Sequence, residues 1–250
     1  MSGISRRDLL KSGSVATAAM AIGFGGMFGT RALAADDETI QEIIDIAATA
    51  ELFATTHYFR ALQSTTKANF AAGERAYIVA GLEQEYFHYN YLVSLGAKPL
   101  ATKFFFPLKT FDDKKTFATV TAIAETVFVG AYIAAAHSFA KLMQPAFAAI
   151  ATQVGCVEAQ HLLFMNQVAG LTPPNNLAIA AAPFYLVKDA VPVVMPLLDG
   201  KKGALGDMET TALDAPDKAA VEKAVGKSTQ LTKLAAPFDT VIAPFADKKA

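Results

Sequence analysis

The stretch "LEQEYFHYNYL", residues 82–92, places Glu85 three residues before His88 in a run that is otherwise mostly aromatic and aliphatic. The stretch "VEAQHLLF", residues 157–164, repeats this pair as Glu158 and His161. Residues three apart on a helix lie about 60° apart around its axis and about one turn apart along it. Each pair can therefore offer a carboxylate and an imidazole to one metal ion, and the two pairs predict a metal site between helices.

Two further glutamates stand alone in apolar runs, Glu51 in "ATAELFATT" and Glu125 in "AIAETVFVG". For any one of these groups the alternative is a buried ion pair or a solvated face, and for the whole set it is a metal-free bundle with protonated glutamates. Burying a carboxylate is costly unless it is paired or metal-bound, yet the only arginines after residue 34 are Arg60 and Arg75. We therefore predict four carboxylate and two imidazole metal ligands: Glu51, Glu85, His88, Glu125, Glu158 and His161.

Apolar spacing and helix-breaking residues predict four long helices, over residues 37–62, 70–95, 112–143 and 145–170. Asp37 is the expected cap of the first helix, and Pro145 fits the first turn of the fourth. The four glutamates each lie about 12 to 15 residues from the start of their helix, so they should meet at one level of a bundle. Their spacing, 34 residues in the first helix pair and 33 in the second, suggests two copies of one hairpin.

The connection after the second helix, "AKPLATKFFFPLKTF", has about 16 residues and no helical periodicity. Fully extended it would reach about 50 Å, whereas a helix of 26 residues is about 39 Å long, so it can cross the whole bundle. We therefore predict an all-α fold, a four-helix bundle with one long crossover over residues 35–170. Residues 171–250 should form a C-terminal extension that packs on the bundle, through "APFYLVKDAVPVVMPLLDG", a polar helix over 216–235 and the final "APFDTVIAPF".

The six predicted ligands resemble the dinuclear carboxylate site of ferritin-like proteins, and their spacing is similar to that of the ferroxidase centre of bacterioferritin. The segments "AETVFVGAYIAAA" and "VEAQHLLF", with the proline-containing apolar tail, resemble exported ferritin-like proteins grouped with desiccation-related proteins. The resemblance covers about residues 37–170. It implies the bundle, two metal ions and chemistry with dioxygen or peroxide, but no particular substrate.

The same resemblance implies a role for each ligand. Glu85 and Glu158 would bridge the metals or nearly so, Glu51 and Glu125 would be terminal ligands, and each histidine would bind one metal. The ions would be two irons, or alternatively manganese or an iron and manganese pair. The long extension departs from a cage-forming ferritin, which argues against iron storage.

Tyr58 and Tyr132 each follow the glutamate of their own helix by seven residues, which keeps them on the ligand face two turns along. They are candidate catalytic residues, redox-active or facing the substrate. Alternatively they are core aromatics whose hydroxyls find a local partner, which is the interpretation we favour. His57 and His137 do not share the ligand face and should be surface or satisfied core residues.

The first 34 residues indicate an export signal. Arg6 and Arg7 precede an uncharged run rich in alanine and glycine, and "RALA" ends in the small residues expected at a cleavage site. The pattern resembles a twin-arginine signal, which exports folded proteins. A retained membrane anchor is the alternative, but the run is only weakly hydrophobic. We therefore expect a periplasmic or otherwise exported protein without membrane insertion after cleavage.

The charge of the chain argues against two classes of binding partner, and its cysteine content excludes an internal disulfide. Without the signal, the 22 basic and 23 acidic side chains become 18 and 22, a net charge of −4. This argues against binding to nucleic acid or to an anionic membrane surface. Cys156 is the only cysteine, so it cannot form an internal disulfide, and we expect it to be a small buried hydrophobe. The partners that remain open are a small-molecule or metal-ion substrate and further copies of the chain.

Two functions are consistent with these features. The first is an exported dinuclear metalloprotein that carries out redox chemistry, such as ferrous iron oxidation, as a ferroxidase-like oxidoreductase. The second is a stress or desiccation-related envelope protein in which the metal mainly stabilises the bundle, without turnover.

Overall fold

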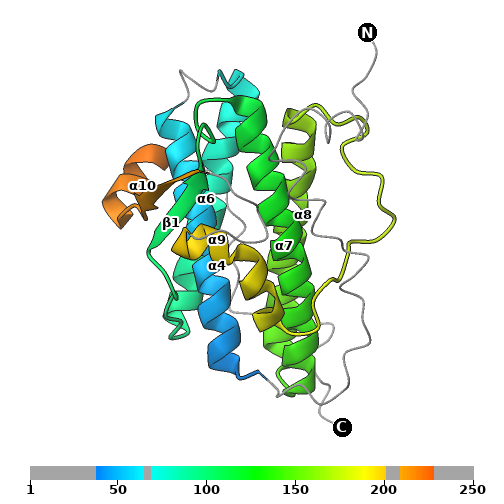
Figure 1. Ribbon diagram of the computed structural model, residues 1–250. Helices are drawn as coiled ribbons and strands as arrows, with labels where there is room; N and C mark the ends of the chain where they lie inside the picture. Colours follow the sequence, from blue (N-terminus) through cyan, green and yellow to red (C-terminus); the bar gives the residue numbers. More distant parts are fainter. Residues whose placement is uncertain (1–37, 65–68, 201–208, 228–250) are drawn as a thin grey trace.

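A computed structural model describes residues 38–64, 69–200 and 209–227 of the chain (Figure 1). The elements are α4 (Ile40–Gln63), α6 (Ala72–Ser94), β1 (Lys103–Pro107), α7 (Lys114–Lys141), α8 (Pro145–Val168), η1 (Val187–Ala190), α9 (Val191–Asp199), β2 (Thr210–Asp214) and α10 (Lys218–Val225). Four long helices run side by side, with the smaller elements against them. Because α4 packs mainly on α6 and α7 mainly on α8, the bundle consists of two helical hairpins. The predicted helical bundle is confirmed, with a small sheet in addition.

Capping side chains set the starts of the long helices. The Thr39 hydroxyl accepts a bond from the backbone N–H of Glu42, and the Glu42 carboxylate accepts one from Thr39 N–H, so the two form a capping box at α4. The prediction of Asp37 as this cap is wrong, and Asp37 itself lies outside the described residues. Asp113 caps α7, and Pro145 opens α8 as predicted.

The crossover between α6 and α7 contains a strand that its sequence did not predict. Strand β1 pairs antiparallel with β2, with Phe105 opposite Ala212. Phe104 and Phe106 are fully buried, and both rings contact Phe53 of α4. The segment is non-helical, as its lack of helical periodicity predicts. Its partner strand lies more than 100 residues later, so no local turn signal marks the pair.

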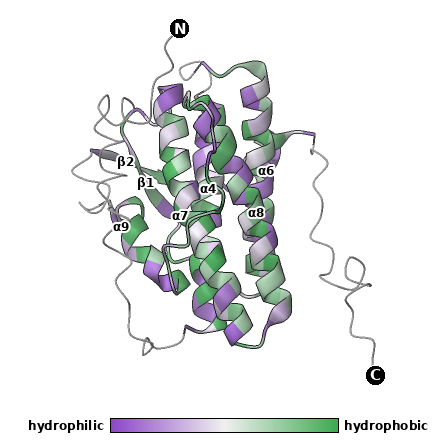
Figure 2. Ribbon diagram, turned by 90° about the vertical axis from the view of Figure 1, so that its right-hand side faces the viewer, coloured by the Kyte–Doolittle hydropathy of each residue, from purple (hydrophilic) through white to green (hydrophobic). Residues whose placement is uncertain are grey.

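Two apolar clusters fill the bundle, one toward each end. One includes Ile44, Phe128 and Ile150, and the other includes Leu82 and Met165. Along the long helices the predicted ligands lie near the boundary between the two clusters. Figure 2 shows apolar residues, in green, along the full length of these helices. The polar ligands are therefore enclosed by hydrocarbon above and below.

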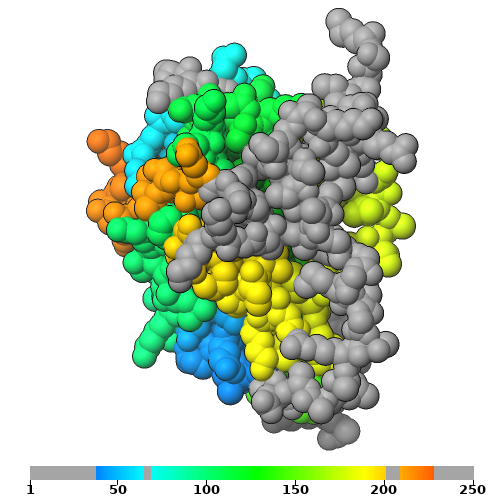
Figure 3. All heavy atoms as spheres, viewed as in Figure 1, coloured from blue at the N-terminus to red at the C-terminus, as the bar shows by residue number. Residues whose placement is uncertain are grey.

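The extension covers the α4 and α7 side of the bundle. Residues of η1 and α9 pack against these helices, and Figure 3 shows this segment, in yellow, lying over α4, in blue. The buried Glu38 carboxylate accepts bonds from the Ser138 hydroxyl (2.7 Å) and from the backbone N–H groups of Val187 (2.9 Å) and Lys188 (3.1 Å). Glu38 thus joins the start of α4 to the extension.

The last part of the extension differs from its prediction. The polar helix expected over 216–235 is shorter: α10 begins after its cap Asp217 and ends before Gly226, whose φ is 70°. Helix α10 packs on α6. The segment "APFDTVIAPF" lies outside the described residues.

The expectation that Cys156 is buried is wrong, because its side chain is exposed. It lies two residues before Glu158 on α8, which is about 200° around the helix, so an inward Glu158 places Cys156 outward. Within the described residues, α7 is the one helix long and apolar enough to cross a membrane. Of its apolar window, 67% is buried inside the bundle, as in the core helix of a soluble protein.

Candidate metal centre

The structure brings all six predicted ligands together from four helices. Each of their side chains is buried, with at most 6% of the residue exposed. The donor atoms form two groups, each within 4.8 Å: Glu51, Glu85, His88 and Glu158 make one, and Glu85, Glu125, Glu158 and His161 make the other. Glu85 and Glu158 belong to both groups. This is an arrangement that could hold two metal ions.

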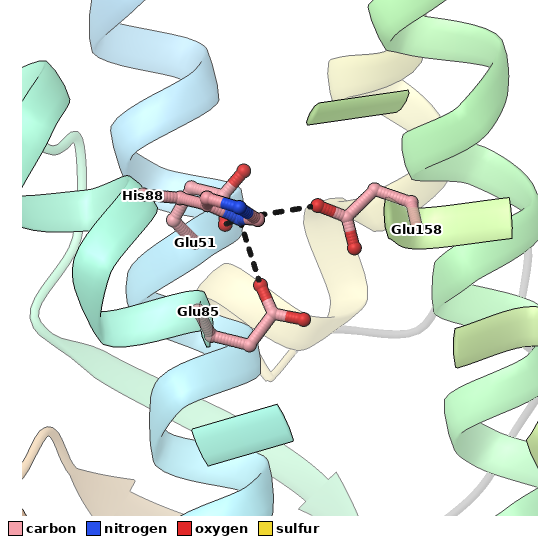
Figure 4. Close-up of side chains that lie close together, drawn as sticks. All are labelled: Glu51, Glu85, His88 and Glu158. Atoms are coloured by element: carbon pink, nitrogen blue, oxygen red, sulfur yellow. Dashed lines mark hydrogen bonds and ion pairs between the residues drawn. The ribbon is translucent and has the colours of Figure 1, made fainter. Parts of the chain in front are cut away.

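The first group is centred on His88, as Figure 4 shows. Its Nδ1 lies 3.2 Å from Oε2 of Glu51, 3.5 Å from Oε1 of Glu158 and 3.9 Å from Oε2 of Glu85. The four side chains come from α4, α6 and α8 and point toward one another. Because each side chain lies near the middle of its helix, the side chains meet at one level of the bundle, as the sequence predicted.

The second group is centred on His161. Its Nδ1 lies 2.7 Å from Oε1 of Glu85, 3.2 Å from Oε2 of Glu158 and 3.6 Å from Oε1 of Glu125. Its Nε2 lies 2.8 Å from the side-chain oxygen of Gln84. When Nε2–H donates to this oxygen, Nδ1 is left free to bind a metal, and such a partner fixes both tautomer and ring orientation.

Gln84 was missed by the sequence analysis. It directly precedes Glu85 on α6 but contacts a histidine 77 residues later on α8. A polar residue beside a predicted ligand is the only local signal, and it does not say which helix the side chain reaches.

The two tyrosines bond across the bundle to the two glutamates that each belong to only one group, Glu51 and Glu125. The Tyr58 hydroxyl of α4 donates to Oε1 of Glu125 on α7 at 3.3 Å, and the Tyr132 hydroxyl of α7 donates to Oε1 of Glu51 on α4. Burial raises the pKa of both hydroxyls well above that of an ordinary tyrosine, so they remain protonated donors. Each tyrosine was expected on the ligand face of its own helix. Each donates its hydrogen bond to the glutamate of the opposite hairpin.

The carboxylates are in an environment that opposes four negative charges. Burial raises the pKa of Glu51 and Glu125 well above that of an ordinary glutamate, and repulsion from Glu158 raises it further. Burial and repulsion therefore favour the protonated form of these two groups when no cation is bound. A bound cation would take the place of those protons.

The histidines respond in the opposite direction. Burial alone would lower their pKa, but attraction to Glu51 raises the pKa of His88 well above normal, and attraction to Glu85 does the same for His161. At Glu85 burial is outweighed by its pairing with His161, and its pKa is lowered. The buried carboxylates thus favour the positively charged form of both His88 and His161.

The oxygens left over fit a metal centre. Both oxygens of Glu85, Oε2 of Glu125 and Oε1 of Glu158 are buried and make no hydrogen bond of good geometry in the described part of the chain, although histidine nitrogens approach the Glu85 and Glu158 oxygens. Buried oxygens are nearly always satisfied in folded proteins, so a group of four calls for a cation. Carboxylate oxygens with imidazole nitrogens are a donor set that iron and manganese accept.

The other histidines stay outside both groups. His57 is fully buried and lies with its Nε2 2.7 Å from the Thr121 hydroxyl. His137 is exposed, with its ring 5.0 Å from that of Tyr185. Both positions agree with the expectation of a core and a surface residue.

Comparison with known proteins adds a family and a signal. A family model described as a ferritin-like domain matches residues 39–171, and a model of the twin-arginine translocation signal sequence matches residues 3–23. Export by the twin-arginine pathway is thus confirmed. No curated protein and no solved structure matches the chain. The family match spans more than half of the 250 residues and contains the four long helices and all six predicted ligands, so the chain belongs to the ferritin-like domain family.

Proposed function

We propose that this exported protein holds two iron or manganese ions and carries out redox chemistry with dioxygen or peroxide, such as the oxidation of ferrous iron. The observation that carries the proposal is the sharing of Glu85 and Glu158 between two groups of donors. A carboxylate has two oxygens and can bind a different ion with each. Two groups that share carboxylates therefore suit two ions held close together.

The roles of the residues follow from their positions. Glu85 and Glu158 would bridge the ions, Glu51 and His88 would complete one ion's ligands, and Glu125 and His161 the other's. Iron or manganese, when bound, supplies the electrons that reduce dioxygen or peroxide. The chain's own part is to hold the donors, exclude bulk water and accept or release protons at the carboxylates.

The tyrosines are proposed to position the terminal ligands. A hydrogen bond from Tyr132 to one oxygen of Glu51 leaves the other oxygen for a metal, and Tyr58 does the same for Glu125. A redox role would use these bonds as well, since the glutamate oxygen is the proton acceptor that an oxidised tyrosine needs. Replacement by phenylalanine separates hydroxyl chemistry from ring packing.

The first test is metal content. Elemental mass spectrometry of the native protein should find about two iron or manganese ions per chain. Glu85→Ala, which removes a shared ligand, should lose most of both ions. Glu83→Ala on the same helix is the matched control, because Glu83 belongs to neither group, and it should keep its metal. Well under one ion per chain in the native protein, not restored by added iron or manganese, would contradict the proposal.

The second test is turnover. Oxidation of two ferrous ions by one dioxygen and two protons gives two ferric ions and one hydrogen peroxide, so iron oxidation, dioxygen uptake and peroxide should be measured together. The loaded protein should catalyse all three and Glu85→Ala should not. Full metal content without turnover, together with a much lower melting temperature after chelation, would instead support the stabilising role.

A further inference from the structure

The two histidines of the metal centre have different surroundings beyond their ligand nitrogens. His161 is fully buried and meets the polar side chain of Gln84. His88 instead lines a small apolar cavity of about 30 Å³ between the four long helices. The two hairpins therefore repeat the ligands but not the residues around them. The His88 side has an adjacent space that a small molecule can enter.

The cavity suits a small uncharged guest. Its walls are mainly hydrocarbon, from Ile43, Ala47, Leu92, Ala135, Ile150 and Ala151 among others. A cavity needs only about 10–15 Å³ to admit a water-sized molecule, but a water also needs two to four polar partners, and apolar cavities remain dry and bind apolar guests. A diatomic gas meets the size and needs no hydrogen bond.

The cavity also touches the metal centre. Two of its lining residues, His88 and Tyr132, are direct neighbours of Glu51: the His88 Nδ1 lies 3.2 Å from Oε2, and the Tyr132 hydroxyl donates to Oε1. His88 and Tyr132 thus belong both to the cavity wall and to the surroundings of the first group of donors.

We propose that this cavity binds dioxygen and delivers it to the metal centre from the His88 side. The proposal rests on the proposed function, which makes dioxygen a reactant. Among the candidate reactants, ferrous iron is charged and peroxide is a strong hydrogen-bonding molecule, whereas dioxygen is apolar and small. The chemistry of the walls therefore selects dioxygen for this route.

A second cavity provides an internal control. It has about 40 Å³, is lined mainly by apolar residues such as Phe53, Ala131 and Val194, and includes none of the six ligands and neither of the two tyrosines. It lies between α4, α7 and the extension. Filling it should perturb packing to a similar degree without affecting access to the centre.

The test uses xenon as a probe for apolar gas sites and leucine as a filler. In the metal-free full chain, xenon under pressure should occupy the His88 cavity, seen in a crystal or through shifted methyl signals of Ile43 and Ile150. Ala151→Leu should remove this xenon, and Ala131→Leu should not. If Ala151→Leu does not fold, Ala135→Val makes a smaller change in the same cavity.

The kinetic arm uses the metal-loaded proteins. With metal content unchanged, Ala151→Leu or Ala135→Val should raise the KM for dioxygen about threefold or more, while Ala131→Leu should leave it at the wild-type value. No xenon in the His88 cavity, or an unchanged KM after xenon is excluded, would overturn the cavity proposal alone. A loaded wild-type protein that consumes no dioxygen would overturn the proposed function as well.

Discussion

His57 is the buried histidine that the metal centre does not use. Its ring stacks on Phe117 with centroids 4.5 Å apart and on Phe106 at 5.5 Å, and its Nε2 meets the Thr121 hydroxyl. Burial lowers its pKa from 6.5 to about 3, because a charged ring among phenyl groups would lose its hydration. His57 is therefore neutral in the folded protein at neutral pH.

This burial predicts an acid-sensitive term in stability. The unfolded chain protonates His57 near pH 6.5 and the folded protein only near pH 3, so stability is complete above pH 6.5 and is lost as the pH falls toward 3. Between pH 6.5 and 5 the loss should be about 2 kcal/mol. Denaturant unfolding of the metal-free protein should show it, and His57→Phe should lack it. The Thr121 hydroxyl also donates to the Phe117 carbonyl, so it keeps a partner in the variant. Equal pH slopes for the two proteins would disprove the assignment.

At the residue scale, the sequence predicts the six candidate ligands but not the residues that hydrogen-bond to them. Glu85 and His88 could be paired from one helix, because spacing along a helix fixes relative direction. The contact of Gln84 with His161 and the crossed bond from Tyr132 to Glu51 depend on how two helices are rotated against each other. That rotation is decided by packing across the bundle, which no single segment encodes.

At the scale of the helices, two glycines inside helices make room for the two tyrosines. A Cβ on Gly81 of α6 would lie 3.1 Å from Cε1 of Tyr58, and a Cβ on Gly155 of α8 would lie 3.1 Å from Cβ of Tyr132. Glycine in a helix costs about 1 kcal/mol relative to alanine. Both glycines lie where a tyrosine packs closely against the helix, and each of these tyrosines hydrogen-bonds to a glutamate of the metal centre.

The close approach predicts opposite effects for two alanine substitutions. Gly155→Ala should lower the free energy of unfolding by about 1 kcal/mol despite its higher helix propensity, because the Cβ of Tyr132 moves only with its backbone. Gly73→Ala, near the start of α6 with nothing within 4 Å of the added carbon, should raise it by about 0.5–1 kcal/mol. Chemical denaturation of both variants gives the comparison. A stabilising Gly155→Ala would mean that Tyr132 is not held by this contact.

The helices could be predicted from local sequence, whereas the pairing of the two strands could not. The four long helices could be predicted because their apolar spacing and caps are local, and their bounds were nearly correct. The pairing of Phe105 with Ala212 could not, since β1 and β2 are far apart in the chain and each is only five residues long. Such a sheet exists because the extension brings β2 to an edge that the crossover leaves open.

At the scale of the whole molecule, the extension is held by a polar link as well as by apolar packing. Glu38, just before α4, accepts two backbone N–H bonds from η1 and one hydroxyl bond from Ser138 of α7. Close packing accompanies it, since a Cβ on Gly130 would lie 2.8 Å from Pro183. The sequence predicted an extension on the bundle from its apolar composition, but a glutamate binding backbone about 150 residues away leaves no pattern.

Removing the Glu38 carboxylate should therefore loosen the extension while sparing the bundle. Glu38→Ala leaves the N–H groups of Val187 and Lys188 without their acceptor. Bonds to a charged group contribute about 1.5–3 kcal/mol each, and water that reaches the freed N–H groups offsets part of this loss. Hydrogen exchange measured by mass spectrometry should become about 30-fold faster across 187–199, at an opening cost reduced by about 2 kcal/mol. Exchange around Glu85 in α6 should stay slow. Ser138→Ala is the control, because it removes only the bond within the bundle and keeps both bonds to the extension. Equal acceleration in the two variants would show that the extension is held by its apolar contacts and that Glu38 only caps the end of the bundle.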